Sequence, residues 1–409
     1  MSLAIFPLLA SLMDLIIGEY VPLITLLCFW GIIYTIFIAI SFIIAIFKRY
    51  LFNFQFKLNF YTIIITILAI FVIISCIINK GNTGYVCLYL CIPLIFICIF
   101  SVDKKYLDIV VHSLLITLAI CCIMGFIDPL NKFMPGFNPL NYQLSIQLGN
   151  PNFSAVVMAS ASVFVYLKID KSNIKQFLYY LSLYVIYILF LFMNGSFAPI
   201  TAVAIIQFFC IIFTSVKEKK FKVKFAILSV IAISTCFLVD LIPDINAIRT
   251  CNYNYFLECV AVVDNIFNTN ILNLFGIDHI MGADGWERKE LMAESIRQCT
   301  SNIHTFFFGS GPGAYNDARP HNILLTIWLD FGIIPTLLCL TLFVGWIIHF
   351  CRTKEKKSTT SFLTIIAFLL ANIVGSLVFY SAYILVIYIA VFVKKQQYIA
   401  ENQSTTEKT

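Results

Sequence analysis

The sequence predicts an all-α polytopic membrane protein with about 12 transmembrane helices and one large polar loop. Of its 409 residues, 61% are hydrophobic and 12% are charged, whereas a typical soluble domain carries about 25% charged residues. The apolar residues also run in long blocks, close to the roughly 20 residues that a helix needs to cross a bilayer. A soluble core cannot bury so many such blocks, which excludes a soluble globular protein.

The blocks predict spans at about residues 3–17, 21–47, 60–78, 86–102, 109–127, 153–167, 177–193, 197–216, 225–242, 321–351, 361–375 and 376–393. The first block has no basic leader and is followed at once by a second, so we expect a hairpin of two spans rather than a signal peptide. The chain then divides into an N-terminal bundle of about nine spans (1–242), a loop (243–320), about three C-terminal spans (321–393) and a polar tail (394–409).

The basic residues predict the orientation of these spans. With a cytoplasmic N-terminus, 20 of the 27 lysines and arginines fall on the cytoplasmic side and seven on the outside. Cytoplasmic loops of membrane proteins are enriched in Lys and Arg. Both termini are therefore expected in the cytoplasm, and the loop 243–320 in the periplasm. Because the cytoplasmic loops are short, chemistry is expected at the outer face.

No metal, cofactor or nucleic-acid partner is predicted. The 14 cysteines include no C-x-x-C pair and no Cys/His spacing typical of a metal site. The net charge of +6 is explained by lysines beside the spans rather than by a basic surface for nucleic acid. Three cysteines, Cys251, Cys259 and Cys299, fall in the loop, where one disulfide is an open alternative.

The loop contains one segment with a helical pattern, Asp284–Cys299. Trp286, Ala293 and Ile296 recur at helical spacing, with acidic residues near the start, where the helix dipole favours them. The segment carries Arg288 and Arg297 as candidate ligands for a phosphate group. Most arginines on a loop helix are simply solvated, and that alternative stays open for both.

The loop ends in a glycine-rich turn followed by Arg319, Pro320 and His321. Pro320 suits a first helical turn, which would place His321 at the start of a span, at the water boundary. A helix N-terminus offers free N–H groups to an anion. Together with Arg288 and Arg319, such an end would suit a pyrophosphate. The simpler alternative is an amphipathic histidine at a membrane boundary beside an ordinary glycine turn.

These motifs, in this order, resemble the O-antigen ligase/polymerase family. The resemblance rests on Arg288, Gly309-Ser310-Gly311, His321-Asn322, Asp330 and Gly332-Ile333-Ile334, and on Gly149-Asn150-Pro151-Asn152 just before an outer span end. It covers roughly residues 145–350. A large periplasmic loop between many N-terminal spans and two or three C-terminal ones is the arrangement of that family.

The resemblance implies a GT-C-like membrane glycosyltransferase of the bacterial inner membrane that needs no metal. Its donor would be an undecaprenyl-pyrophosphate-linked oligosaccharide. His321 is then the candidate for activating the acceptor hydroxyl, and Arg288 for holding the pyrophosphate, with Arg319 and Arg297 as further candidate cations. The supporting residues would be Gly309, Gly311, Asn322, Asn150 and Asn152.

Three functions remain open at this point. The first is a polymerase of lipid-linked repeat units of O-antigen or another surface polysaccharide, with a chain-length regulator as a conceivable partner. The second is a ligase that transfers the finished glycan to lipid A-core in lipopolysaccharide biosynthesis. The third is a flippase or transporter, which should carry ionisable residues or broken helices within its spans. Because the spans are nearly free of charge and the polar residues concentrate in one outside loop, the sequence favours an outer-face enzyme over a carrier. Between the two enzymes, which use the same donor, we favour the polymerase.

Overall fold

The computed structural model describes residues 60–79, 99, 104–127, 151–169, 173–194, 197–215, 284–311, 322–352, 356–371, 388–392 and 394. Within these ranges all regular structure is helical and there is no strand, which confirms the all-α prediction. The expected spans at 3–17, 21–47 and 225–242 lie outside the described residues, as do most of those at 86–102 and 376–393. The count of twelve therefore stays a prediction.

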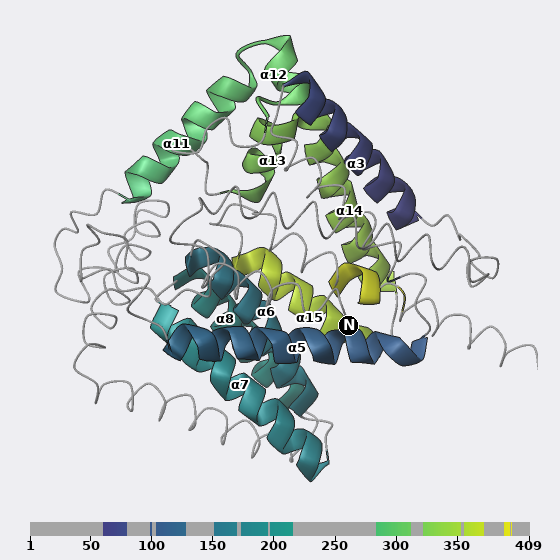
Figure 1. The fold of residues 1–409 in the computed structure, drawn as a ribbon, viewed down its shortest axis with the longest axis vertical. Coiled ribbons are helices and arrows are strands. Elements are labelled where there is room, and N and C mark those ends of the chain that lie inside the picture. Colours follow the sequence, from purple (N-terminus) through teal and green to yellow (C-terminus); the bar gives the residue numbers. More distant parts are fainter. Residues whose placement is uncertain are drawn as a thin grey trace, which may run out of the picture. The chain divides into compact units, whose positions relative to one another are not determined.

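The helices follow the predicted blocks closely (Figure 1). Five of them match single predicted spans of the N-terminal bundle: α3 (Phe60–Ile78), α5 (Lys104–Ile127), α6 (Pro151–Ile169), α7 (Ile174–Asn194) and α8 (Phe197–Ser215). Two lie in the predicted loop, α11 (Asp284–Cys299) and α12 (Ile303–Phe308). Three follow it: α13 (Ile323–Phe331), α14 (Ile333–Arg352) and α15 (Lys356–Ala371).

The chain forms two compact units. One comprises Met1–Leu118, Ser295–Ile365 and Ser376–Thr409, and the other Ala119–Glu294 and Ile366–Gly375. The end of the predicted loop therefore belongs to the same unit as α3, which is more than 200 residues away in the sequence. This long-range packing places the candidate site.

In the second unit, α6 is the buried centre. It packs against α7 and α8, and its residues from Ala155 to Tyr166 are all buried. Small side chains allow this close packing, and the hydroxyls of Ser160 and Ser162 donate to the carbonyls of Val157 (2.7 Å) and Ala159 (2.8 Å). Polar groups in an apolar interior are tolerated when they are hydrogen-bonded in this way.

In the first unit, α13 and α14 form a helical hairpin and do not continue one another. The predicted span 321–351 is interrupted at Gly332, which caps α13 with φ +93° and donates its N–H to the Trp328 carbonyl at 2.8 Å. The sequence reading as one continuous span was wrong here, because an apolar run does not reveal a turn made by a single glycine. Figure 1 shows α13 and α14 descending side by side from the position of α12.

The direction of these helices follows from contacts with α3. Ser75, near the C-terminal end of α3, lies beside the backbone of Asp330, just before α14 begins. The ring of Phe60, at the other end of α3, lies beside Gly345 in α14. Helices α3 and α14 are therefore antiparallel, and α13 runs toward the end of α3 before α14 runs back along it.

Helices α3 and α14 leave apolar side chains exposed along one stripe each. On α3 the stripe comprises Phe60, Ile63, Ile67, Ile70, Ile74 and Ile77, and on α14 it comprises Leu337, Leu340, Val344, Ile347 and Ile348. These spacings of three and four residues define one helix face. By length and composition, one described segment, Ile174–Leu191 in α7, is long and apolar enough to cross a membrane, and five shorter helices are apolar.

Candidate functional site

The helix predicted at Asp284–Cys299 is present with those bounds as α11. A three-residue turn joins it to α12, whose N-cap is Asn302. The Asn302 side chain accepts the Thr305 N–H at 2.8 Å, and the Thr305 hydroxyl donates to the Gln298 carbonyl at 3.2 Å. A side-chain cap satisfies an N–H group that the first helical turn leaves free, so α12 is firmly attached to the end of α11.

The glycine turn after α12 docks onto the C-terminal end of α13. The Ser310 N–H donates to the Leu329 carbonyl at 2.7 Å, and the Gly311 N–H donates to the Asp330 carbonyl at 3.1 Å. A Cβ on Gly309, which has φ +69°, would lie 2.5 Å from the Asp330 carbonyl carbon. The two pieces of the motif, the G-S-G turn and Asp330-Phe331-Gly332, are therefore in direct backbone contact.

Side chains of α12 and α13 add further contacts between the two helices. The Trp328 indole N–H donates to the Phe306 carbonyl at 3.2 Å. The rings of Phe306 and Trp328 meet edge to face, with centroids 5.6 Å apart, an arrangement that aromatic pairs favour. Helix α12 is thus held at both its backbone and its aromatic face.

Helix α3 supplies two polar side chains to the same place. The Ser75 hydroxyl, which is fully buried, contacts the Phe308 carbonyl and lies 3.3 Å from the Asp330 carbonyl. The Asn79 amide donates to the Phe308 carbonyl at 3.1 Å. Phe308 is the last residue of α12, where carbonyls lack partners within the helix. Ser75 and Asn79 therefore complete the C-terminal end of α12.

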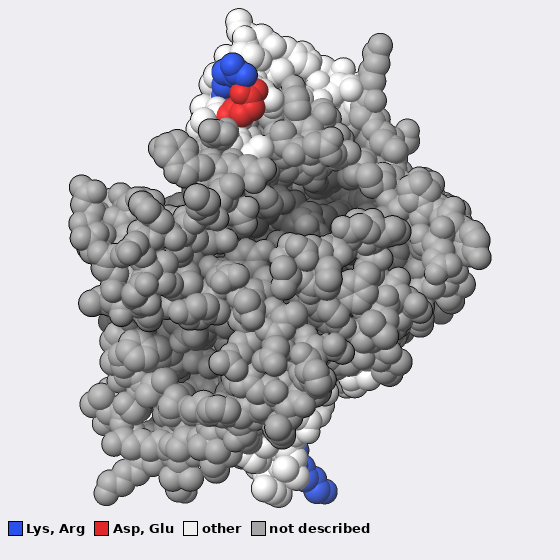
Figure 2. All heavy atoms as spheres, turned by 90° about the vertical axis from the view of Figure 1, so that its left-hand side faces the viewer, with Lys and Arg blue, Asp and Glu red and all other residues white. Residues whose placement is uncertain are grey.

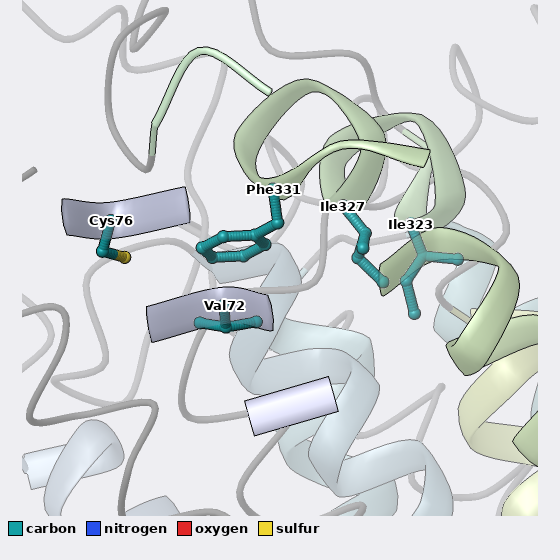
Figure 3. Packing of buried hydrophobic residues seen from close by; sticks show 5 residues of the cluster. All are labelled: Val72, Cys76, Ile323, Ile327 and Phe331. Carbon is teal, nitrogen blue, oxygen red and sulfur yellow. The ribbon is translucent and has the colours of Figure 1, made fainter. Parts of the chain in front are cut away.

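An apolar cluster supports this arrangement from below. Val72 and Cys76 of α3 pack with Ile323, Ile327 and Phe331 of α13 (Figure 3). The three α13 residues are four apart and so share one face. This packing fixes α13 alongside α3, and in the close-up view the Phe331 ring lies above Val72 and beside Cys76.

Asp330 and Cys299 lie close together behind the turn. Both are buried, and burial first, then the nearby Asp330 carboxylate, raises the pKa of the Cys299 thiol to about 11. Cys299 is a free thiol; Cys251 and Cys259 lie outside the described residues. The Cys299 thiol is thus uncharged at neutral pH. Because only the thiolate is nucleophilic, Cys299 is expected to be unreactive there.

The histidine motif enters the described structure at Asn322, since His321 and Arg319 lie outside the described residues. Asn322 is the N-cap of α13, and its side chain accepts the N–H groups of Leu324 (3.0 Å) and Leu325 (3.1 Å). The helix begins at Ile323, so Pro320 does not stand in its first turn, contrary to the sequence expectation. The expected anion site is also reduced, because the Asn322 cap already occupies two of the free N–H groups.

The hairpin changes where this helix end lies. Because α13 runs toward the turn at residues 309–311, Asn322 is separated from Gly332 by the length of α13, about 14 Å for nine residues. The helix that follows Asn322 has nine residues and is not a full span; the place of His321 at the water boundary stays a prediction, because His321 lies outside the described residues. The N-terminal end of α13 faces back along α3, where Ile323 packs in the same cluster as Val72.

The two loop arginines occupy different sides of α11. Arg297 is exposed, whereas Ser295 and Cys299 are buried. Residues 288 and 297 are nine apart, so their positions differ by about 180° around an α-helix, whereas 288 shares a side with 295. The register of α11 therefore places positions 288 and 297 on opposite faces of the helix, and the roles of Arg288 and Arg297 stay predictions.

The remaining predicted residues are placed in part. The second asparagine of the G-N-P-N segment, Asn152, lies in the first turn of α6, which begins at Pro151; Asn150 lies outside the described residues. Proline is favoured at the first helical position. Among the described residues, no group of three or more His, Cys, Asp or Glu side chains is arranged to hold a metal.

Sequence reasoning missed the contribution of α3. Ser75 and Asn79 are polar residues at the end of an otherwise apolar block, four positions apart, and that spacing places them on one helix face. The pattern could have identified a polar contact at this end of α3. It could not have identified the partner, the carbonyl of Phe308.

In comparisons with known proteins, no protein-family model matches this chain, and no curated protein matches its sequence.

Proposed function

We propose that this chain is a metal-independent glycosyltransferase of the bacterial inner membrane that polymerises repeat units of a surface polysaccharide, such as O-antigen, from an undecaprenyl-pyrophosphate-linked donor. The observation that carries the proposal is the contact between the G-S-G turn and Asp330. The G-S-G turn and Asp330 are separate pieces of the family pattern, and the bonds Ser310–Leu329 and Gly311–Asp330, each between residues 19 apart in sequence, join them. Their joint order was the basis of the resemblance, and their contact supports a common role.

The proposed chemistry is a displacement at the anomeric carbon of the donor. The acceptor hydroxyl oxygen forms the new glycosidic bond, the bond from the anomeric carbon to the phosphate oxygen breaks, and undecaprenyl pyrophosphate leaves with both electrons. His321 takes the proton of the acceptor hydroxyl, because an imidazole near its ordinary pKa can accept a proton at neutral pH. Arg288 and Arg319 stabilise the negative charge that develops on the pyrophosphate.

Membrane placement rests on the apolar surface. The exposed isoleucine stripe of α3 and its counterpart on α14 suit contact with lipid chains. Figure 2 agrees with this, since on the face it shows most of the described surface is neutral and charged side chains gather in small groups. We further propose the topology of about twelve spans with a GT-C-like fold, both termini in the cytoplasm and the loop 243–320 in the periplasm.

A second candidate is a transporter of lipid-linked sugar, and one feature favours it. Helices interrupted within a membrane protein are typical of transporter binding sites, and here α13 ends at Gly332 beside the buried Asp330. We prefer the glycosyltransferase because Gly332 and Asp330 contact the turn of the outer loop, where the histidine and arginines of the pattern are concentrated.

The proposal is tested by separating surface lipopolysaccharide on a gel, from a strain lacking this chain and from the complemented strain. Loss of the ladder, with a core that carries a single repeat unit, is the expected result. A core with no repeat units, and long polymer retained on the lipid carrier, would replace the polymerase with a ligase acting on lipid A-core. Accumulation of single lipid-linked units on the cytoplasmic side would support the transporter instead.

A further inference from the structure

The open face of α12 carries large apolar side chains although it belongs to the polar loop. Ile303 is 79% exposed and Phe307 is 41% exposed. They are four residues apart and so share one face of the helix. The other contacts of α12 lie elsewhere, since Phe306 meets Trp328 and the Phe308 carbonyl accepts from Asn79.

This face stands at the end of α3. Ser75 and Asn79 fix the C-terminal end of α12 to the last turn of α3. We call Ile303 and Phe307 the outer apolar patch. It is separate from the exposed stripe of α3, which lies on the side of that helix away from Ser75 and Asn79.

The length of α3 gives the level of the patch. Nineteen residues make a helix of about 28 Å at 1.5 Å per residue, and the hydrocarbon core of a bilayer is about 30 Å thick. An α3 that crosses the membrane therefore ends at its boundary, and α12 is fixed at that end. The distribution of lysines and arginines predicts this end to be the outer one.

We infer that the outer apolar patch inserts into the lipid headgroup boundary of the outer leaflet, so that α12 is an interfacial helix and its occupant is membrane lipid. The inference rests on the membrane placement in the proposed function and goes beyond it. Interfacial helices combine an apolar face with polar residues beside it, and His304, which follows Ile303 in α12, is exposed. The turn 309–311, which follows α12 directly, is thereby held at the outer membrane boundary.

The test is photocrosslinking in native membranes with full-length protein. Benzoylphenylalanine replaces Ile303 or Phe307, and in matched controls it replaces Thr300, an exposed polar residue of the α11–α12 turn, or Ile70, in the middle of the α3 stripe. After irradiation, peptides are analysed by mass spectrometry. The expected result is a mass increase of one phospholipid at positions 303, 307 and 70, and none at 300.

Two results would overturn the inference. Adducts at 303 and 307 with another part of this chain, or with a second copy, would show that protein covers the patch. Lipid adducts at 70 but not at 303 or 307 would leave the membrane placement intact and remove the interfacial helix alone. If position 70 also fails to label lipid and carbonate washing releases the protein from membranes, the membrane placement in the proposed function fails together with it.

Discussion

Replacing Gly332 by alanine should disrupt the contact between the glycine turn at residues 309–311 and the α13–α14 hairpin. Gly332 has φ +93° and ψ 177°, a conformation that costs residues other than glycine about 1–3 kcal/mol. An added Cβ would also overlap the Phe307 carbonyl and lie 2.6 Å from the Phe308 nitrogen. Relief requires α12 to move away from α13, which breaks the Ser310–Leu329 and Gly311–Asp330 bonds, worth about 1 kcal/mol each.

The sum predicts a destabilisation of about 3–5 kcal/mol for Gly332→Ala. The free energy of unfolding would be measured by SDS titration in mixed micelles, followed by circular dichroism. Gly345→Ala is the matched control in α14, because its Cβ would meet only the ring edge of the exposed Phe60, which can turn aside. We expect that control to change stability by no more than about 1 kcal/mol. Equal, small effects of the two substitutions would refute the packing described here.

Three further outcomes follow from the site. Arg288→Lys should reduce glycan transfer strongly, because lysine lacks the planar guanidinium that binds a pyrophosphate through two hydrogen bonds. Arg297→Lys is its control. Full activity of Arg288→Lys would show that Arg288 does not bind the pyrophosphate. Asn79→Ala should destabilise the protein by about 1 kcal/mol, since it removes one of two side-chain donors to the Phe308 carbonyl, and an unchanged unfolding free energy would contradict that contact. At pH 9 about 1% of the Cys299 thiol should be ionised, whereas most of an ordinary cysteine with a pKa of about 8.5 is ionised at that pH. Because its pKa is raised, Cys299 should resist alkylation through pH 9 and become reactive as the pH rises through about 11. Rapid alkylation of Cys299 in folded protein at pH 9, measured by peptide mass spectrometry, would contradict this.

The helices that the sequence located well are those whose signal is local. Helix α3 follows its apolar block from Phe60 to Ile78, and α11 has its predicted bounds at Asp284 and Cys299. In both cases composition and 3.6-residue periodicity determine the helix without reference to distant parts of the chain. The charged and polar residues of α11 also distinguish it in sequence from the apolar blocks.

The hairpin at Gly332 could not be predicted, because its cause is tertiary. An isolated glycine inside an apolar run is compatible with a continuous helix. Here the positive φ of Gly332 is fixed by the close approach of Phe307 and Phe308 from the loop, which no local pattern reveals. The docking of Gly309 and Gly311 onto Asp330, and the role of Ser75 and Asn79 in α3, are hidden for the same reason.

The candidate residues themselves were only partly placed by the structure. Asn322 was expected beside a helix N-terminus and is its cap, but the cap takes N–H groups that an anion was expected to use. Arg288 was expected to hold the pyrophosphate and Arg297 was a further candidate cation, and the register of α11 places the two positions on opposite faces of the helix. His321 as a general base and Arg319 as a phosphate ligand stay predictions of the sequence.

The central claim is that His321 activates the acceptor of a glycan transfer. The most direct measurement uses purified protein in liposomes with an undecaprenyl-pyrophosphate-linked repeat unit, and follows polymer length and release of undecaprenyl pyrophosphate. His304→Ala is the matched control, because His304 is an exposed histidine on α12 beside Phe308. We predict polymer from the wild type and from His304→Ala, and none from His321→Ala although it is inserted and folded. Normal polymer from His321→Ala would contradict the account.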